Sequence, residues 1–272
     1  VPSSSISVAI KSGEYDIVQN FSATKWEEVQ GLDNIDILGR PELYYSYLGF
    51  KLGKYDYTAN TVITDIEGSK MGDKELRQAM GYALDIELVS EVYYNSLRER
   101  ANSLIPPVFK SYYDESLEGY VYNPDKANEI LDAAGYKDVD GDGIREDKDG
   151  NPLEIKLASM SGDQTQEDVM SFYIQNWKDV GLNVTLVTGR LMDINSFYEK
   201  VQNDAPEIDI FMGAWGTGTN PSPFGIYSKT AEYNLSRYTS EELETTLLNI
   251  DSKDAFDNEY RAKQFRAFQE YV

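Results

Sequence analysis

An acidic stretch at residues 138–149, DVDGDGIREDKD, has the residue types and the spacing of a calcium-binding loop. In a twelve-residue loop of the EF-hand kind, alternate acidic residues supply side-chain oxygens, and Gly143 would allow the sharp turn at position 6. The predicted calcium ligands are four carboxylates and one backbone carbonyl: Asp138, Asp140, Asp142, the carbonyl of Ile144, and Asp149.

Two features of the same stretch favour an exposed acidic turn without a bound ion. Position 12 of the template is Asp149, whereas a longer glutamate usually reaches the metal there with both oxygens. Gly135 is expected to end the preceding helix and Asp149-Gly150 is a turn signal, so no helix enters or leaves the loop. Both interpretations stay open at the level of sequence.

A second candidate site is the glycine-rich segment at residues 213–225, GAWGTGTNPSPFG, which follows an apolar run that is typical of a buried strand. Ligands of open α/β sheets gather at the carboxyl ends of strands, where glycines let backbone approach a ligand and an indole can stack on it. The predicted ligand contacts are Trp215, Gly216, Gly218 and Asn220, together with Tyr45 and Tyr47 of an aromatic strand. The alternative is an ordinary turn with a packed indole and core tyrosines.

The composition excludes several classes of function. The chain of 272 residues has neither histidine nor cysteine, so Ser-His-Asp and Cys-His catalysis and zinc sites with imidazole or thiolate ligands are absent. Its 47 acidic residues outnumber its 25 basic ones, for a formal charge of −22, and no basic stripe is present. We therefore expect no nucleic-acid partner and no binding to anionic membrane surfaces.

Strand and helix patterns alternate along the chain. Strands are predicted at 15–18, 35–38, 43–52, 153–160, 184–187 and 208–215, and helices at 23–30, 73–84, 86–97, 124–134, 164–180, 195–202 and 255–272. Apolar strands that alternate with helices predict an α/β fold with a largely parallel or mixed sheet. The sequence has no run of about 18 apolar residues, so no membrane span is predicted.

Several of these segments, in this order, resemble the oligopeptide- and dipeptide-binding proteins of ABC transporters, which are extracellular solute-binding proteins of family 5. The segments are SGEYDI at 12–17, LYYSYLGFKL at 43–52, DKELRQAMGYALD at 73–85, IPP at 105–107, YNPDKANEILDAAGY at 122–136, DGDGIRED at 140–147, FYIQNWKDVGLNVTL at 172–186 and IDIFMGAW at 208–215, followed by RYTSEEL at 237–243. Each segment alone is a weak signal. The series covers nearly the whole chain and is specific.

The resemblance implies a periplasmic-binding-protein-like lobe with a mixed β-sheet flanked by helices, truncated from a two-lobed protein that closes on a peptide. Residues 1–35 would lie near the hinge and the first lobe, and residues 36–272 would form most of the second lobe. It also implies a monomer that is not an enzyme, outside the cell as a membrane-anchored lipoprotein or in a periplasm, with peptides and transporter permease subunits as partners. No cofactor is then required, beyond a possible structural calcium.

The resemblance also bears on the two candidate sites. In the family, the loop after the IDIFMGAW-like strand carries a tryptophan, which Trp215 matches, and then an aspartate that pairs with the α-amino group of the peptide. Gly218 stands at the place of that aspartate, and Asn220 is the nearest residue with a side-chain amide. The acidic stretch corresponds to a hairpin away from the cleft. From the residues alone, a carbohydrate-active enzyme with two carboxylates and a calcium-dependent surface module remain alternatives.

Overall fold

The computed structural model describes residues 5–272 and divides the chain into two compact units. Among the described residues, one unit combines 5–41 with 85–100, and the other combines 42–84 with 101–272. Which lobe of a larger protein each unit represents stays a prediction.

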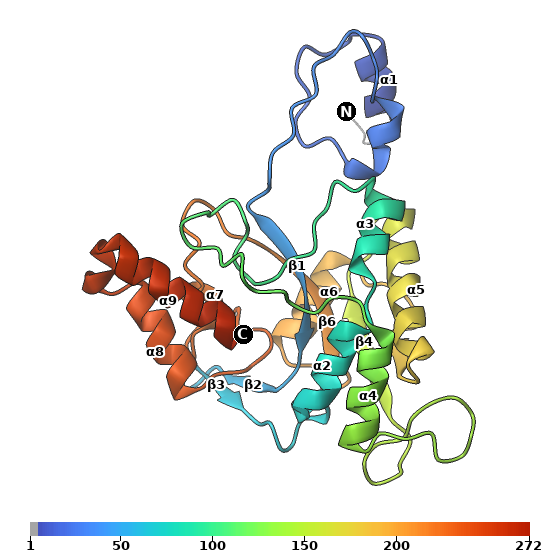
Figure 1. Cartoon of the computed structure of the whole chain (residues 1–272), viewed down its shortest axis with the longest axis vertical. Coiled ribbons are helices and arrows are strands. Elements are labelled where there is room, and N and C mark those ends of the chain that lie inside the picture. Colours follow the sequence, from blue (N-terminus) through green and yellow to red (C-terminus); the bar gives the residue numbers. More distant parts are fainter. Residues whose placement is uncertain (1–4) are drawn as a thin grey trace. The chain divides into compact units, whose positions relative to one another are not determined.

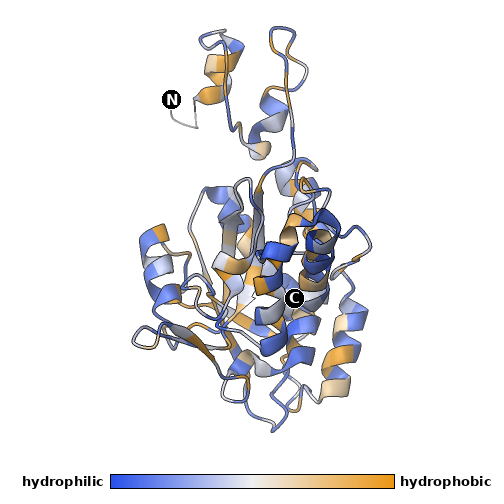
Figure 2. Cartoon of the chain, turned by 90° about the vertical axis from the view of Figure 1, so that its left-hand side faces the viewer, coloured by the Kyte–Doolittle hydropathy of each residue, from blue (hydrophilic) through white to orange (hydrophobic). Residues whose placement is uncertain are grey.

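The smaller unit contains only helices and irregular segments among its described residues. They are α1 (Ile6–Lys11), the 3-10 helix η1 (Ala23–Glu28) and α3 (Ile86–Tyr94). Asp85 caps α3 by accepting a hydrogen bond from the N–H of Leu88 at 2.9 Å, and the side-chain amide of Asn95 donates to the carbonyl of Ala23 at 2.9 Å. Figure 2 shows the apolar residues that dominate α1.

The strands predicted at 15–18 and 35–38 are wrong, because both segments are irregular. Their apolar residues do not reach a core: Ile17 is 79% exposed and Leu38 is 94% exposed. A strand needs a partner for its backbone and a buried face for its side chains, and neither segment has a paired strand in the structure. Local alternation of apolar and polar residues was therefore a misleading signal here.

The larger unit is built on a four-stranded sheet with the order β1-β6-β4-β5. Figure 1 labels β1, β6 and β4 of this sheet. The strands are β1 (Tyr44–Phe50), β6 (Ile210–Gly216), β4 (Glu154–Ser159) and β5 (Asn183–Leu186). β4 pairs in parallel with both β5 and β6, whereas β1 pairs with β6 in the antiparallel direction. The predicted α/β fold with a mixed sheet is confirmed. A separate hairpin of β2 (Gly53–Asp56) and β3 (Thr61–Thr64) was not predicted.

The α-helices of the larger unit, apart from α7 (Phe224–Tyr227) with Pro223 at its N-cap, begin where short polar side chains satisfy the first free N–H groups. They are α2 (Lys74–Tyr82), α4 (Pro124–Ala134), α5 (Gln164–Asp179), α6 (Ile194–Gln202), α7 (Phe224–Tyr227), α8 (Glu241–Ile250) and α9 (Asn258–Tyr271), with short 3-10 turns η2 (Lys70–Gly72) and η3 (Lys253–Phe256). The predicted C-terminal helix is thus a 3-10 turn followed by α9. None of the helices in residues 5–272 has the length and apolar character of a membrane span.

Two buried aromatic side chains illustrate how helices of the larger unit are held in place. Trp177 of α5 is fully buried, and its indole N–H donates to the carbonyl of Met80 in α2 at 3.0 Å. On another part of the unit, Phe197 of α6 packs in one cluster with Phe211 of β6, and both side chains are fully buried. Burial of a large aromatic side chain contributes about 1.5–3 kcal/mol, so these contacts hold α5 against α2 and α6 against β6.

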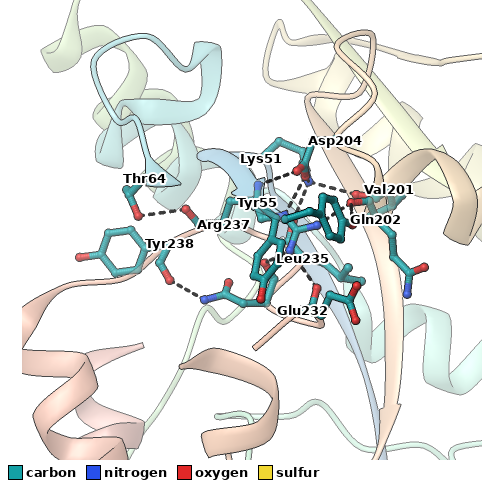
Figure 3. A network of polar contacts seen from close by, with 12 residues as sticks. Lys51, Tyr55, Thr64, Val201, Gln202, Asp204, Glu232, Leu235, Arg237 and Tyr238 are labelled. Atoms are coloured by element: carbon teal, nitrogen blue, oxygen red, sulfur yellow. Dashed lines mark hydrogen bonds and ion pairs between the residues drawn. The ribbon is translucent and has the colours of Figure 1, made fainter. Parts of the chain in front are cut away.

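A buried polar network joins the ends of β1 and α6 to the loop before α8 (Figure 3). The carboxylate of Asp204 accepts hydrogen bonds from Lys51, from Nε of Arg237 at 2.7 Å and from the backbone N–H of Tyr55 at 2.8 Å. The ammonium group of Lys51 also donates to the carbonyls of Val201 at 3.1 Å and Leu235 at 2.9 Å. One carboxylate thereby ties three segments that are distant in sequence.

Candidate ligand site at the carboxyl end of strand β6

Aromatic residues and glycines face each other across the β1–β6 pair. Tyr47 lies opposite Gly213, and Gly49 lies opposite Phe211. A Cβ atom added to Gly213 would come within 2.9 Å of the Tyr47 ring, and one added to Gly49 would come within 2.2 Å of the Phe211 ring. The rings of Tyr47 and Phe211 pack edge to face, with their centroids 5.8 Å apart. Each ring occupies the space that the glycine on the opposite strand leaves free.

Tyr45 is a core residue of this strand pair. It is 6% exposed, and its hydroxyl is 2.9 Å from the hydroxyl of Tyr227 in α7. Burial raises the pKa of Tyr45 to about 12, although the hydrogen bond with Tyr227 opposes the shift. Burial likewise raises the pKa of Tyr47, with further contributions from the neighbouring Tyr45 and Tyr198. All of these hydroxyls stay neutral near pH 7 and serve as hydrogen-bonding groups.

Trp215 stands nearer to solvent at the end of the same strand. Its ring is half-buried and lies 5.6 Å from the ring of Tyr233, which is 47% exposed. Tyr44, which faces Gly216 across the strand pair, is 56% exposed. The carboxyl end of β6 therefore presents exposed aromatic surface, which suits apolar groups and planar amides.

The loop after β6 begins with a firm attachment and then opens to solvent. The N–H of Thr217 donates to the carbonyl of Leu43 at 2.8 Å and extends the β1–β6 ladder by one bond. Gly218 is exposed, its φ is +64°, and apart from its two chain neighbours no residue of 5–272 has an atom within 4 Å of the place where a Cβ would stand. A side chain at this position would be strained, so glycine keeps the backbone of the loop accessible.

Asn220 is exposed but its amide oxygen is already engaged. It accepts hydrogen bonds from the N–H of Ser222 at 3.2 Å and from Nη2 of Arg261 at 3.1 Å. Arg261 lies in α9, 41 residues further along the chain. Asn220 thus has a structural contact whether or not its free NH₂ group meets a ligand.

The structure brings Trp215, Gly216, Gly218 and Asn220 together on one strand end and its loop, and it places Tyr45 and Tyr47 beside them across the sheet. Tyr45 and Tyr47 face inward, whereas the first four border solvent. Their contact with a ligand stays a prediction. Sequence reasoning missed Tyr227, Tyr233 and Arg261, because only long-range contacts connect them to the loop.

The acidic stretch forms a turn that is closed by its own carboxylates. Asp138 accepts hydrogen bonds from the N–H groups of Gly141 at 2.7 Å and Gly143 at 2.9 Å, and Asp142 accepts one from Ile144 at 2.7 Å. One carboxylate oxygen each of Asp138, Asp140 and Asp142 lies within 4.8 Å of the others.

In residues 5–272, Asp149 does not join this group, and its backbone N–H donates to Asp147 at 2.9 Å. The three clustered carboxylates could hold a hard cation with the carbonyl of Ile144, and the calcium assignment stays a prediction.

Two basic residues anchor this turn to the helices. Arg145 donates to the carbonyl of Val180 at 2.9 Å and to Asp132 of α4 at 2.6 Å. Lys148 pairs with Asp73, the N-cap of α2. Burial alone would raise the pKa of Asp73, but hydrogen bonds from Glu75 N–H, Lys148 and the Tyr136 hydroxyl outweigh it and hold the pKa at about 2. These contacts attach the acidic turn to α2, α4 and the end of α5.

Sequence comparison assigns the chain to a family. The model for the middle part of bacterial extracellular solute-binding proteins, family 5, matches residues 1–236. The chain belongs to this family. It is 35% identical over 265 residues to the oligopeptide-binding protein OppA of Lactococcus lactis subsp. lactis, and the match covers 96% of this chain and 44% of that protein. The chain thus spans about half the length of the curated relatives that it matches.

Solved structures of the family show the same fold. Lactococcal OppA, complexed with an endogenous peptide in the closed conformation, superposes with a TM-score of 0.91 at 34% identity, covering 100% of this chain and 50% of that one. The oligopeptide-binding protein AppA from Bacillus subtilis, in complex with a nonapeptide, gives a TM-score of 0.79 at 22% identity, with 99% and 50% coverage. The predicted family and its α/β architecture are confirmed.

Proposed function

We propose that the protein containing this chain is the substrate-binding component of an ABC importer, and that it binds oligopeptides between two lobes. The observation that carries the proposal is the 35% identity to an oligopeptide-binding protein together with the TM-score of 0.91 to its peptide complex. Closure over the ligand would be driven by contacts that form only in the closed state. The relatives are binding proteins, so we do not propose the carbohydrate-active enzyme.

The geometry at the end of β6 supports a peptide as the ligand class. An accessible loop with glycine at 218 can offer backbone N–H and C=O groups to the main chain of a peptide, as in strand addition. Trp215 and Tyr233 supply aromatic surface for its side chains. Main-chain hydrogen bonds are the same for every peptide sequence, so we expect broad rather than narrow selectivity.

We also propose the surroundings in which this component works. The protein would act outside the cell or in a periplasm, anchored by a lipid or free, and would deliver peptides to permease subunits as a monomer without catalysis. The family description supports the extracellular setting. The anchor, the permease contact and the monomeric state rest on the family resemblance alone.

Mass spectrometry of ligand that co-purifies with the protein tests the proposal. The protein should be purified under native conditions with whatever sequence flanks these residues, and its ligand released with acid. A ladder of oligopeptides would support the proposal. A single non-peptidic compound, with no peptide bound on later titration, would overturn it.

A further inference from the structure

A closed ring of polar contacts joins the loop after β6 to the helical pair α8 and α9. Asn220 Oδ1 accepts from Ser222 N–H at 3.2 Å and from Nη2 of Arg261 at 3.1 Å. The same Nη2 lies 3.4 Å from Asp251 Oδ1, and the Ser222 hydroxyl donates to the other oxygen of Asp251. Two residues of the ring thus come from the loop and two from the helical pair.

The guanidinium of Arg261 is fixed independently of the loop. Its Nε donates to the carbonyl of Ile250 at 3.2 Å, and its Nη1 donates to the hydroxyl of Tyr112 at 3.3 Å. It also lies over the rings of Tyr112 and Phe265, at 5.4 and 5.5 Å from their centroids. The side chain is only 22% exposed. Arg261 therefore presents Nη2 to the loop in one orientation, which a flexible ammonium group would not do.

The middle of the loop depends on this ring. At its start, Thr217 is tied to Leu43, and at its end Pro221 and Pro223 are buried. Residues 218–220 between these attachments are exposed, and Gly218 has open space around it. Among these three exposed residues, Asn220 has the side-chain link to the helices.

We propose that Arg261 is a positioning residue for the ligand site. It holds the loop at residues 217–223 in the conformation that meets the peptide, and it does so through Asn220 without touching the ligand itself. The inference rests on the function proposed above. Its physical basis is preorganisation: a loop that is already ordered loses less conformational entropy when a ligand binds.

The test compares Arg261→Met and Arg261→Lys with Lys263→Met, which removes an exposed charge from the same helix. Each variant is made in the protein with its flanking sequence intact. Affinity is measured by calorimetry with the tightest binder from a panel of synthetic nonapeptides. We expect Kd to rise about tenfold for Arg261→Met, the size of one lost charge-assisted hydrogen bond. The Kd of Arg261→Lys should lie between those of the wild type and Arg261→Met, and the Kd of Lys263→Met should equal that of the wild type.

A second readout separates positioning from stability. In protein labelled with 5-fluorotryptophan, the ¹⁹F resonance of Trp215, assigned with Trp215→Phe, should shift or broaden in Arg261→Met without ligand. The resonance of Trp177 should not move. If Arg261→Met fails to fold, Asn220→Ala breaks the same link from the loop side and should give the same pattern.

The outcomes distinguish this inference from the proposed function. If the wild-type protein binds no nonapeptide of the panel, the proposed function fails and takes the inference with it. If the wild type binds, but Arg261→Met or Asn220→Ala binds within twofold and the Trp215 resonance stays in place, the function stands and the positioning role is wrong.

Discussion

The ring of Tyr47 occupies the space above Gly213 on the neighbouring strand, where a Cβ atom would come within 2.9 Å of it. Gly213→Ala therefore forces Tyr47 out of its packed position or pushes β1 away from β6. We expect a loss of about 1–3 kcal/mol in the free energy of unfolding, measured by urea denaturation. Ligand binding at the candidate site, which begins two residues further along β6, should weaken in the same variant.

Gly225 provides the matched control for this substitution. It lies in α7, no atom is within 4 Å of its added Cβ, and its φ is not in the left-handed region. Gly225→Ala should leave the stability unchanged or raise it by about 0.5–1 kcal/mol. Equal effects of the two substitutions would contradict the role assigned to the Tyr47–Gly213 contact.

The elements that sequence predicted well are those with local signals. Helices were predicted from residues 73 and 124, and the second was expected to end at Gly135; the structure has Asp73 and Asn123 as the N-caps of these helices and Gly135 as the C-cap, at φ +99°. These signals are local because a cap satisfies backbone groups within one turn. Segments without a cap were less certain, as the irregular 15–18 and 35–38 show.

The contacts that shape the site could not be predicted, because they join residues that are far apart in sequence. Tyr45 and Tyr227 are 182 residues apart, and Asn220 and Arg261 are 41 apart. The sequence pattern placed Trp215 and the glycines at the end of a strand, because an apolar run followed by glycines is a local signal. No local pattern states which helix supplies the arginine that reaches the loop.

The buried carboxylate of Asp204 is expected to contribute strongly to stability. Asp204→Asn keeps the shape of the side chain but leaves Lys51 and Arg237, which are 8% and 0% exposed, without their counter-charge. Removing one partner of a buried ion pair costs about 3–5 kcal/mol. Chemical denaturation should show a loss of this order.

An exposed pair serves as the comparison for Asp204. Glu207 and Lys200 form an ion pair in which both side chains are about 40% exposed, as 42% and 39%. Glu207→Gln should cost less than about 1 kcal/mol, because solvent screens the pair. A loss of similar size in both variants would argue against a special role for the buried network.

Lys51 should make stability depend on pH in the alkaline range. Burial lowers its pKa from 10.5 to about 8, although Asp204 opposes the shift. Between these two values the unfolded chain binds the proton and the folded chain does not, so stability should rise with pH from about 8 towards 10.5. The full pKa shift of Lys51 corresponds to a change of roughly 3 kcal/mol in the free energy of unfolding.

Denaturation between pH 8 and 9.5 measures this slope before the buried tyrosines begin to interfere. Lys51→Met should abolish the rise, whatever its effect on absolute stability. Lys263→Met, which removes an exposed lysine, should retain the rise. The interpretation would be wrong if the wild type and Lys51→Met followed parallel curves.

Calcium should raise the stability of the protein if the clustered carboxylates of Asp138, Asp140 and Asp142 bind it. At a calcium concentration one hundred times Kd, the stabilisation would be about 2.7 kcal/mol, and a chelator would remove it. Asp140→Asn should lose this response. Among residues 5–272, its side chain accepts the N–H of Asp142 alone, at 3.1 Å, so the turn itself should survive the change. Identical melting curves in calcium and in chelator would refute the assignment.

Gly218 leads to a prediction about the ends of the peptide. The family resemblance places an aspartate for the peptide amine where this chain has an exposed glycine, and the polar side chains beside it, Thr217, Thr219 and Asn220, carry no charge. A free N-terminal ammonium group would therefore find no counter-ion at this position. We expect N-acetylated and free forms of one peptide to bind with Kd values within about threefold of each other, since no charge-assisted hydrogen bond is lost.

Restoring the carboxylate tests the same point in the other direction. Gly218→Asp should favour the free amine over the acetylated form, although the positive φ of +64° makes the substitution strained. Asparagine and aspartate tolerate this backbone region better than most residues, and Gly218→Asn supplies the same strain without charge. A selectivity for the free amine that appears in the aspartate variant and not in the asparagine variant would show that the missing charge makes the wild-type loop indifferent to the peptide terminus.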